Sequence, residues 1–225
     1  MSTSARSARR QSVTLRTSAA EFVRHPSPWM ISAMLAAALV GRLLVGDWQV
    51  SDAWLPIVML AAFPLLEWAI HVCILHWRPK RFAGLTLDSH LARSHREHHA
   101  DPRDVPLIFI PWQTLVLLIP TLIVGALLAF PRPGLALTFL IVIGAIGLAY
   151  EWTHYLIHSD YRPKSRMYHA IWLNHRQHHY KNEHYWFTVT TAGTADRVLH
   201  TYPDVKQVPT SPTAKNLHAG AARGA

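Results

Sequence analysis

Residues 134–158 read GLALTFLIVIGAIGLAYEWTHYLIH, an apolar run that ends in a glutamate and two histidines. The first 17 residues of this stretch carry no charge. A helix needs about 20 mostly apolar residues to cross a bilayer, so the stretch predicts a membrane-spanning helix with polar residues at one end. Polar side chains inside a span are costly in lipid unless they have a partner or a function. This end of the helix is therefore a candidate functional site.

Three more apolar runs predict three further spans, at residues 29–46, 54–77 and 106–130. The first contains a single charge, Arg42, which is close enough to the helix end to reach the interface. A Pro-Arg-Pro-Gly break at 131–134 separates the last two spans, which we expect to form a helical hairpin. The prediction is an all-α integral membrane protein of about four transmembrane helices.

The positive charges lie on one side of these spans. Of the 22 Lys and Arg residues, 20 lie in segments 1–25, 78–104 and 159–225, which hold five, six and nine. Because Lys and Arg are retained in the cytoplasm, we expect both termini and a histidine-rich helical cap to be cytoplasmic, in a bacterial inner membrane or the endoplasmic reticulum. The net charge of +9 is not arranged as an aromatic-interleaved patch, so it favours a membrane surface and no nucleic acid.

The sequence suggests that the chain has three parts. Residues 1–27 form a basic N-terminal segment. Two interpretations are open for it, the basic flank of a first span and a transit peptide. Residues 28–204 form the four-span domain with its cap. Residues 205–225 lack periodicity, so we expect a flexible tail.

Histidine is the unusual residue of this chain, with 16 copies, of which 13 lie between His71 and His184. Ten of them form two similar series, each with a pair at the end of a span and an HxxHH trio further along. The series are His71, His76, His95, His98 and His99, and then His154, His158, His175, His178 and His179. If the trios are helical, their i, i+3, i+4 spacing lets each converge on one point. His71 and His76 are about 140° apart on an α-helix, and share a face only if a π-type bulge lies between them.

Ten imidazoles at one membrane face are enough for two metal ions with about five ligands each. Imidazole binds iron, copper, nickel and zinc, so histidine alone does not identify the metal. A zinc protease is disfavoured because Glu97 is in the wrong order for an HExxH motif. Two redox-active irons suit O₂-dependent attack on an unactivated C–H bond of a lipid. Glu67 and Glu151 lie within one helical turn of His71 and His154, and we expect them to hold the second ring nitrogen of these ligands.

The histidine pattern resembles the fatty acid hydroxylase superfamily, which includes fatty acid 2-hydroxylases, sterol desaturases and oxidases, and carotenoid hydroxylases. The resemblance extends roughly from His71 to Pro203 and is carried by the two pairs and the two HxxHH trios. The nineteen-residue step from His76 to His95, and the order HHYKNEHYWFTVTT at 178–191, look most like the 2-hydroxylase branch. His200-Thr201 stands where the family pattern has Gly-Thr.

The resemblance implies a dinuclear iron site held by the ten histidines, with O₂ as the oxidant. The implied reaction is hydroxylation of a fatty acid, or of a fatty-acyl or sphingolipid chain, at the membrane surface. It also implies an electron donor of the cytochrome b5 or ferredoxin type, which we expect to be a separate protein. Zinc can replace iron in a purified sample, because it ranks above ferrous iron in ligand affinity.

Three alternatives stay open from the sequence: a sterol or carotenoid hydroxylase or desaturase of the same superfamily, a non-enzymatic metal-handling membrane protein, and a bis-histidine haem protein. A transporter would place its ligands near the middle of the membrane, whereas these lie at one face. A haem site needs only two axial histidines. The sequence assigns no role to His90, His169, His184 or His200.

Overall fold

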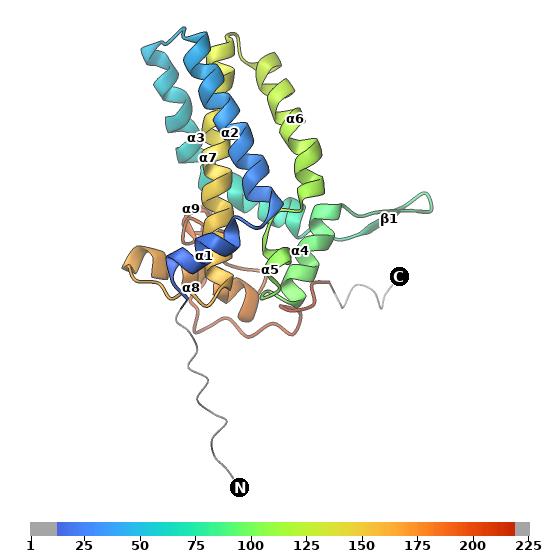
Figure 1. Cartoon of the computed structure of the whole chain (residues 1–225). Helices are drawn as coiled ribbons and strands as arrows, with labels where there is room; N and C mark the ends of the chain where they lie inside the picture. The colour runs from blue at the N-terminus through green and yellow to red at the C-terminus, as the bar shows by residue number, and fades with distance from the viewer. Residues whose placement is uncertain (1–12, 219–225) are drawn as a thin grey trace.

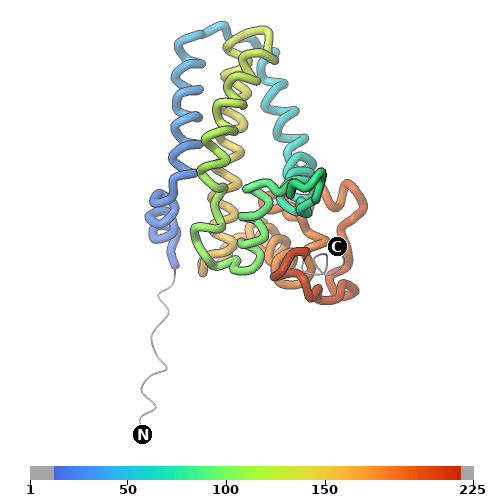
Figure 2. Tube along the Cα trace, turned by 90° about the vertical axis from the view of Figure 1, so that its right-hand side faces the viewer, coloured from blue at the N-terminus to red at the C-terminus, as the bar shows by residue number. Residues whose placement is uncertain are grey.

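The computed structural model describes residues 13–218 (Figure 1). Four long apolar helices stand side by side, and the shorter elements, except the 3₁₀ turn at residues 50–53, gather at one end of this bundle (Figures 1 and 2). The elements, in chain order, are α1 (Leu15–Phe22), α2 (Pro26–Val45), the 3₁₀ turn η1 (Val50–Ala53), α3 (Trp54–Ile70), the π-helical turn η2 (His71–Leu75), β1 (Lys80–Phe82), β2 (Leu85–Leu87), α4 (His90–Ala100), α5 (Val105–Ile108), α6 (Trp112–Ala129), α7 (Pro133–His158), α8 (Arg166–Tyr180) and α9 (Thr194–Val198).

The predicted fold class is confirmed, because the described chain is mostly helical and has four helices long and apolar enough to cross a membrane. Their bounds are Pro26–Val45, Val50–Leu75, Val105–Ala129 and Pro133–His158. One small departure is the antiparallel hairpin of β1 and β2, in which Phe82 pairs with Leu85. It projects sideways at the level where the bundle meets the cap (Figure 1).

Helix α7 is the central element of the bundle, since it contacts α2, α3 and α6. Its Gly144 allows α2 to approach closely, because a Cβ atom there would lie 3.2 Å from the Cβ atom of Leu35. Between these helices lies a buried apolar cluster of Met34, Ala38, Ala126, Ala136 and Leu140. The packing fixes the direction in which α7 carries its last turn into the cap.

The third predicted span is broken at residues 109–111, between α5 and α6. Pro111 precedes the first residue of α6 and has no backbone N–H, and the residue before a proline is disfavoured in the α conformation. Ile108 and Ile110 are therefore left with backbone groups that no helix uses. The carbonyl of Ile108 and the N–H of Ile110 both take part in the site described below.

The π-type bulge needed for His71 and His76 to share a face is present. Residues 71–75 form a π-helical turn, and the N–H of His76 donates to the carbonyl of His71 at 3.0 Å. This i→i+5 bond closes one turn over five residues. The two imidazole centroids are consequently only 5.0 Å apart.

Arg42 does not reach toward the interface as expected, and is buried instead at the end of the bundle away from the cap. Its guanidinium donates to Asp47 at 3.0 Å and to Asp52 at 3.1 Å. Arg132 also donates to Asp52. This ion-pair cluster ties the loop after α2 to the start of α7.

Segments outside the spans pack against the cap and against α7. In the N-terminal segment, residues 1–12 lie outside the described residues, but Phe22 of α1 packs against Trp152 of α7 with ring centroids 5.1 Å apart. Residues 205–218, for which we expect a flexible tail, pack on the cap in this structure. Buried side chains in this stretch are Val208, Ala214 and Leu217. Residues 219–225 lie outside the described residues.

Candidate metal centre

All ten histidines of the two series meet in the cap, at the ends of α3 and α7. Nine of them are buried and His76 is partly buried. They separate into two groups, and within each group the candidate ligand atoms all lie within 4.8 Å of one another. Group 1 consists of His71, His76, His95, His99 and His178, and group 2 consists of His98, His154, His158, His175 and His179.

The expectation that each trio converges on one point is wrong. Helix α4 gives His95 and His99 to group 1 but His98 to group 2, and α8 gives His175 and His179 to group 2 but His178 to group 1. The i and i+4 residues of a helix are about 40° apart, whereas i+3 and i+4 are about 100° apart. The middle histidine of each trio therefore points toward the other group, and the groups adjoin, with the His99 and His179 rings stacked at 4.1 Å.

The spacing of the ring nitrogens fits metal coordination. Two imidazoles bound to one ion at about 2.1 Å each are separated by about 3.0 Å when adjacent and about 4.2 Å when opposite. The Nε2 atoms of His71 and His95 are 3.1 Å apart, and those of His175 and His179 are also 3.1 Å apart. In addition, several buried Nε2 atoms have no hydrogen-bond partner among the described residues. They belong to His98, His99, His154 and His158.

Burial keeps these imidazoles in the form that binds metals. It lowers the pKa of His99 to about 4, although a hydrogen bond to the carbonyl of Ala214 acts in the opposite direction. Burial also lowers the pKa of His98 and His179 well below 6.5, with further lowering from neighbouring histidines. A neutral imidazole is the ligating species, so the site is suited to a cation near neutral pH.

Backbone carbonyls hold the ring nitrogens that face away from the two groups. The Nδ1 atoms of His99, His154 and His178 donate to the carbonyls of Ala214 at 2.9 Å, Ile108 at 2.8 Å and Tyr185 at 2.8 Å. The Nδ1 atom of His71 donates to the carbonyl of Phe187. A ligating histidine is oriented by such an acceptor.

Contrary to expectation, the described residues show no hydrogen bond from Glu67 or Glu151 to a histidine. Glu67 accepts hydrogen bonds from the backbone N–H of Val189 at 3.1 Å and of Thr190 at 2.8 Å, and from the hydroxyls of Thr190 and Thr191. This segment begins two residues after Phe187, the acceptor for His71. Glu67 thus fixes the loop whose carbonyl orients the ligand.

Glu151 repeats this arrangement in the other half of the chain. It accepts a hydrogen bond from the N–H of Ile110 at 2.8 Å and from the hydroxyl of Ser27 at 3.0 Å. Ile110 lies two residues after Ile108, which is the acceptor for His154. Both buried carboxylates therefore act on a ligand through a neighbouring loop.

The remaining histidines lie outside both groups. His90, His169 and His200 are exposed, and His184 is exposed with its Nε2 atom 3.5 Å from Glu183. Sequence reasoning missed the carbonyl acceptors, because any residue type supplies a carbonyl. It also missed Glu183, whose side chain is 2% exposed and contacts the C-terminal segment.

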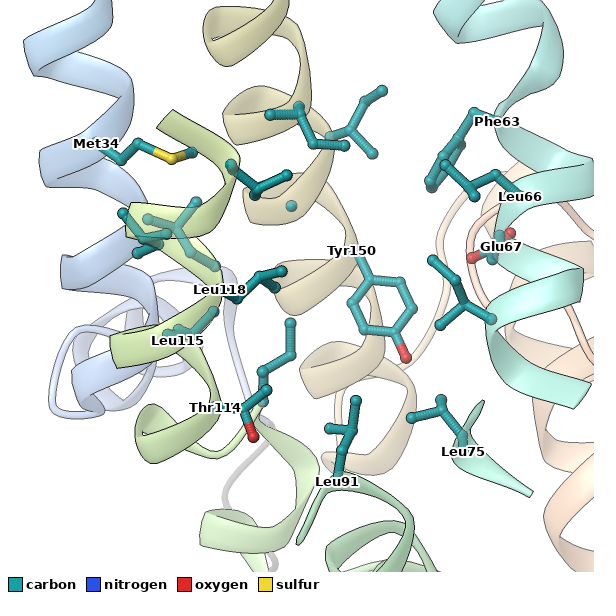
Figure 3. Close-up of a pocket in the computed structure, with 18 of the residues that line it drawn as sticks. Met34, Phe63, Leu66, Glu67, Leu75, Leu91, Thr114, Leu115, Leu118 and Tyr150 are labelled. Carbon is teal, nitrogen blue, oxygen red and sulfur yellow. The ribbon is translucent and has the colours of Figure 1, made fainter. Parts of the chain in front are cut away.

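An apolar cavity of about 230 Å³ lies between α2, α3, α6 and α7 and is lined by His71 of group 1 (Figure 3). Figure 3 shows Tyr150 of α7 projecting into it between the side chains of α6 and those of α3. A smaller cavity of about 40 Å³ is lined by His95 and His154, one from each group. The two cavities share four lining residues, namely Leu75, Leu91, Ile110 and Tyr150. The larger cavity therefore reaches from between the long helices to a histidine of group 1, and the smaller cavity adjoins it.

Fold and site together define a helical protein with four candidate membrane spans and a buried pair of histidine groups suited to metal ions. The sequence model of the fatty acid hydroxylase family matches residues 56–201, and the chain belongs to this family. Membership indicates an oxidoreductase that acts on lipids at a membrane. The resemblance inferred from the histidine pattern is thereby confirmed.

One solved structure with a similar fold is that of full-length Scs7p, in which only the hydroxylase domain is visible. The TM-score is 0.60 at 20% sequence identity, and the match covers 87% of this chain and 68% of that chain. At this identity the likeness shows a shared fold. A search of the curated proteins gave no match.

Proposed function

We propose that this chain is an O₂-dependent di-iron hydroxylase of a fatty acid or a fatty-acyl chain, including that of a sphingolipid. The observation that carries the proposal is the apolar cavity that leads from between the spans to His71. A pocket of this kind suits a hydrocarbon chain and excludes water from the reacting carbon. Family membership and the fold shared with the hydroxylase domain of Scs7p support the same reaction class.

The ten histidines would hold the two iron ions, five ligands to each. Bound iron would supply the activation of O₂ and the oxidation of the C–H bond. In the overall reaction the lipid C–H bond becomes C–OH and the second oxygen atom leaves as water. A separate donor of the cytochrome b5 or ferredoxin type supplies two electrons, and two protons are taken up from the solvent. Glu67 and Glu151 would keep ligands His71 and His154 oriented through the loops they fix.

The residues of the cavity would hold the chain of the substrate. The carbon to be hydroxylated would lie near the histidines, beside the four residues that line both cavities, which are Leu75, Leu91, Ile110 and Tyr150. The remainder of the chain would extend among the aliphatic side chains of the four helices. This arrangement lets a lipid reach the histidines without leaving an apolar environment.

Isotope labelling tests the reaction. The iron-loaded protein should be given a fatty-acyl lipid, a reductant, a donor protein and ¹⁸O₂, and the product hydroxyl should carry the label. His179→Ala should abolish turnover, whereas His169→Ala, an exposed position on the same helix, should retain it. A product labelled from water, or full turnover by the His179 variant, would contradict the proposal.

We also propose that the cap and both termini are cytoplasmic, on the basis of the charge distribution. Reporter fusions at the N-terminus and after Tyr202 should be active in the cytoplasm, and a fusion in the loop between Asp47 and Asp52 should not. The reverse pattern would contradict this orientation.

A further inference from the structure

The C-terminal segment of residues 205–218, here called the strap, lies over group 1. The carbonyl of Ala214 accepts the hydrogen bond of His99 Nδ1 at 2.9 Å. Near the end of the strap, His218 Nε2 donates to the carbonyl of His76 at 3.1 Å. Both histidines belong to group 1, and among the described residues the strap makes no hydrogen bond to a histidine of group 2.

A buried carboxylate fixes the strap beside Ala214. Glu183 Oε1 accepts hydrogen bonds from the hydroxyl of Ser211 at 3.0 Å and from the hydroxyl of Thr213. Burial raises the pKa of Glu183, but the hydrogen bonds from Thr213 and Ser211 lower it by more than burial raises it. The pKa of Glu183 is therefore below its ordinary value. The side chain is therefore an ionised acceptor at neutral pH.

The backbone beside Glu183 adds further contacts. The N–H of Ser211 donates to the carbonyl of Lys181 at 2.7 Å, and the side-chain amide of Asn182 donates to the carbonyl of Pro209 at 3.2 Å. The strap is thus held by three consecutive residues that follow α8. Helix α8 itself carries His178 of group 1, so the strap and this ligand are fixed to the same element.

We propose that the strap supports metal binding by group 1 and that Glu183 is its positioning residue. Glu183 acts on His99 through Thr213 and the adjacent Ala214. This inference rests on the proposed metal-binding function. It makes Glu183 the third buried glutamate that orients a ligand through a loop carbonyl, after Glu67 and Glu151. The family match ends at residue 201, so the strap lies outside the matched region.

Two truncations test the strap by iron content. A chain ending at residue 218 removes only residues outside the described part, and should keep the same two irons per chain as the full chain. A chain ending at residue 204 lacks the strap, and should keep about one, because only group 1 loses its support. The measurement is the iron-to-protein ratio after gel filtration in detergent.

Full-length variants separate positioning from folding. Glu183→Ala removes the acceptor, and we expect the affinity of one of the two sites to fall about 10 to 100-fold. Glu183→Gln keeps an oxygen that accepts from both hydroxyls, so it should bind metal like the unchanged chain. The absorption spectrum of the cobalt-substituted protein, which reports ligand geometry, should shift for the alanine variant and not for the glutamine variant.

The outcomes distinguish this inference from the function it rests on. An unchanged chain that binds no metal would overturn both. Two irons in the unchanged chain and two in the chain ending at residue 204, or equal cobalt spectra for both Glu183 variants, would overturn the strap alone. Loss of both irons together from the shortened chain would contradict the assignment to group 1.

Discussion

Four of the ten histidines donate their outward ring nitrogen to a backbone carbonyl, and the position of each carbonyl depends on a loop. The residue types in the sequence predicted which side chains gather, because imidazole is the recurring group. They did not predict the acceptors, because the carbonyls of Phe187, Ala214, Ile108 and Tyr185 leave no mark in the sequence. Glu67 and Glu151 were identified as supporting residues, but their hydrogen-bond partners depend on how the loops fold.

Glu67 offers a direct test of this indirect support. Glu67→Ala leaves the N–H groups of Val189 and Thr190 without their acceptor, which we expect to cost about 1–3 kcal/mol each if they stay buried. Loss of the loop position should also lower metal affinity about 10 to 100-fold. Glu67→Gln keeps one oxygen and should be mild. Isothermal titration with metal would reveal the difference, and equal affinities for the two variants would argue against it.

His200 has an unusual backbone conformation. Its φ of 58° lies in the left-handed region, and it follows the end of α9 in a Schellman arrangement, with the N–H of Thr201 bonded to the carbonyl of Asp196 at 2.7 Å. Glycine is the favoured residue at this position, in keeping with the Gly-Thr expected there from the resemblance. The exposed imidazole at this position is therefore a conformational cost.

His200→Gly should consequently stabilise the chain, by about 1 kcal/mol. The matched control is His169→Gly in the interior of α8, which should destabilise it by about 1 kcal/mol. Thermal unfolding in detergent measures both. A lower midpoint for the His200 variant would show that the loop depends on the imidazole itself.

At the scale of elements, the π-helical turn makes the two histidine pairs equivalent. In α7 the four-residue step from His154 to His158 spans one α-helical turn, and at the end of α3 the five-residue step from His71 to His76 spans one π turn. Deleting Cys73 should convert the π turn into an α turn with the ligand pair still on one face. Inserting an alanine after Cys73 should turn His76 away.

The iron content of these two variants distinguishes them. The deletion should keep about two irons per chain, whereas the insertion should lose one. If both variants kept two irons, His76 would not be needed as a ligand. If both lost one, the winding of the turn would matter beyond the position of His76.

The spans could be predicted from the sequence because apolar length is a strong signal, and the trios could be assigned to helices from their spacing. The break before α6 could not be placed, because the uncharged run continues through Pro111. The split of the trios could not be foreseen from either helix alone. It depends on where α4 and α8 cross, which is set by packing between distant segments.

At the scale of the whole molecule, burial of the histidines links stability to pH. The pKa of His99 is about 4 in the folded chain because of burial, against 6.5 for an exposed imidazole. The folded state therefore binds fewer protons than the unfolded state between these values. The stability of the metal-free chain should be fully present above about pH 6.5 and should fall as the pH drops toward 4.

The midpoint of thermal unfolding, measured at pH steps across this window, checks the prediction. Iron-loaded protein should resist acid to a lower pH, because a bound ion competes with the proton for the imidazole. A midpoint for the metal-free chain that stayed constant from pH 7 to 4.5 would mean that the imidazoles are open to water.

His98 and His178, the middle histidines of the two trios, each belong to the group that is supplied mainly by the other half of the chain. The two halves are therefore interdependent. The first half supplies four of the five members of group 1 and one member of group 2, and the second half supplies the complementary set. A chain with the ligands of one half alone would hold no complete centre, and two copies side by side would be needed. Separating the halves today, by a cut in the loop between α6 and α7, would leave each fragment one histidine short until the fragments associate again.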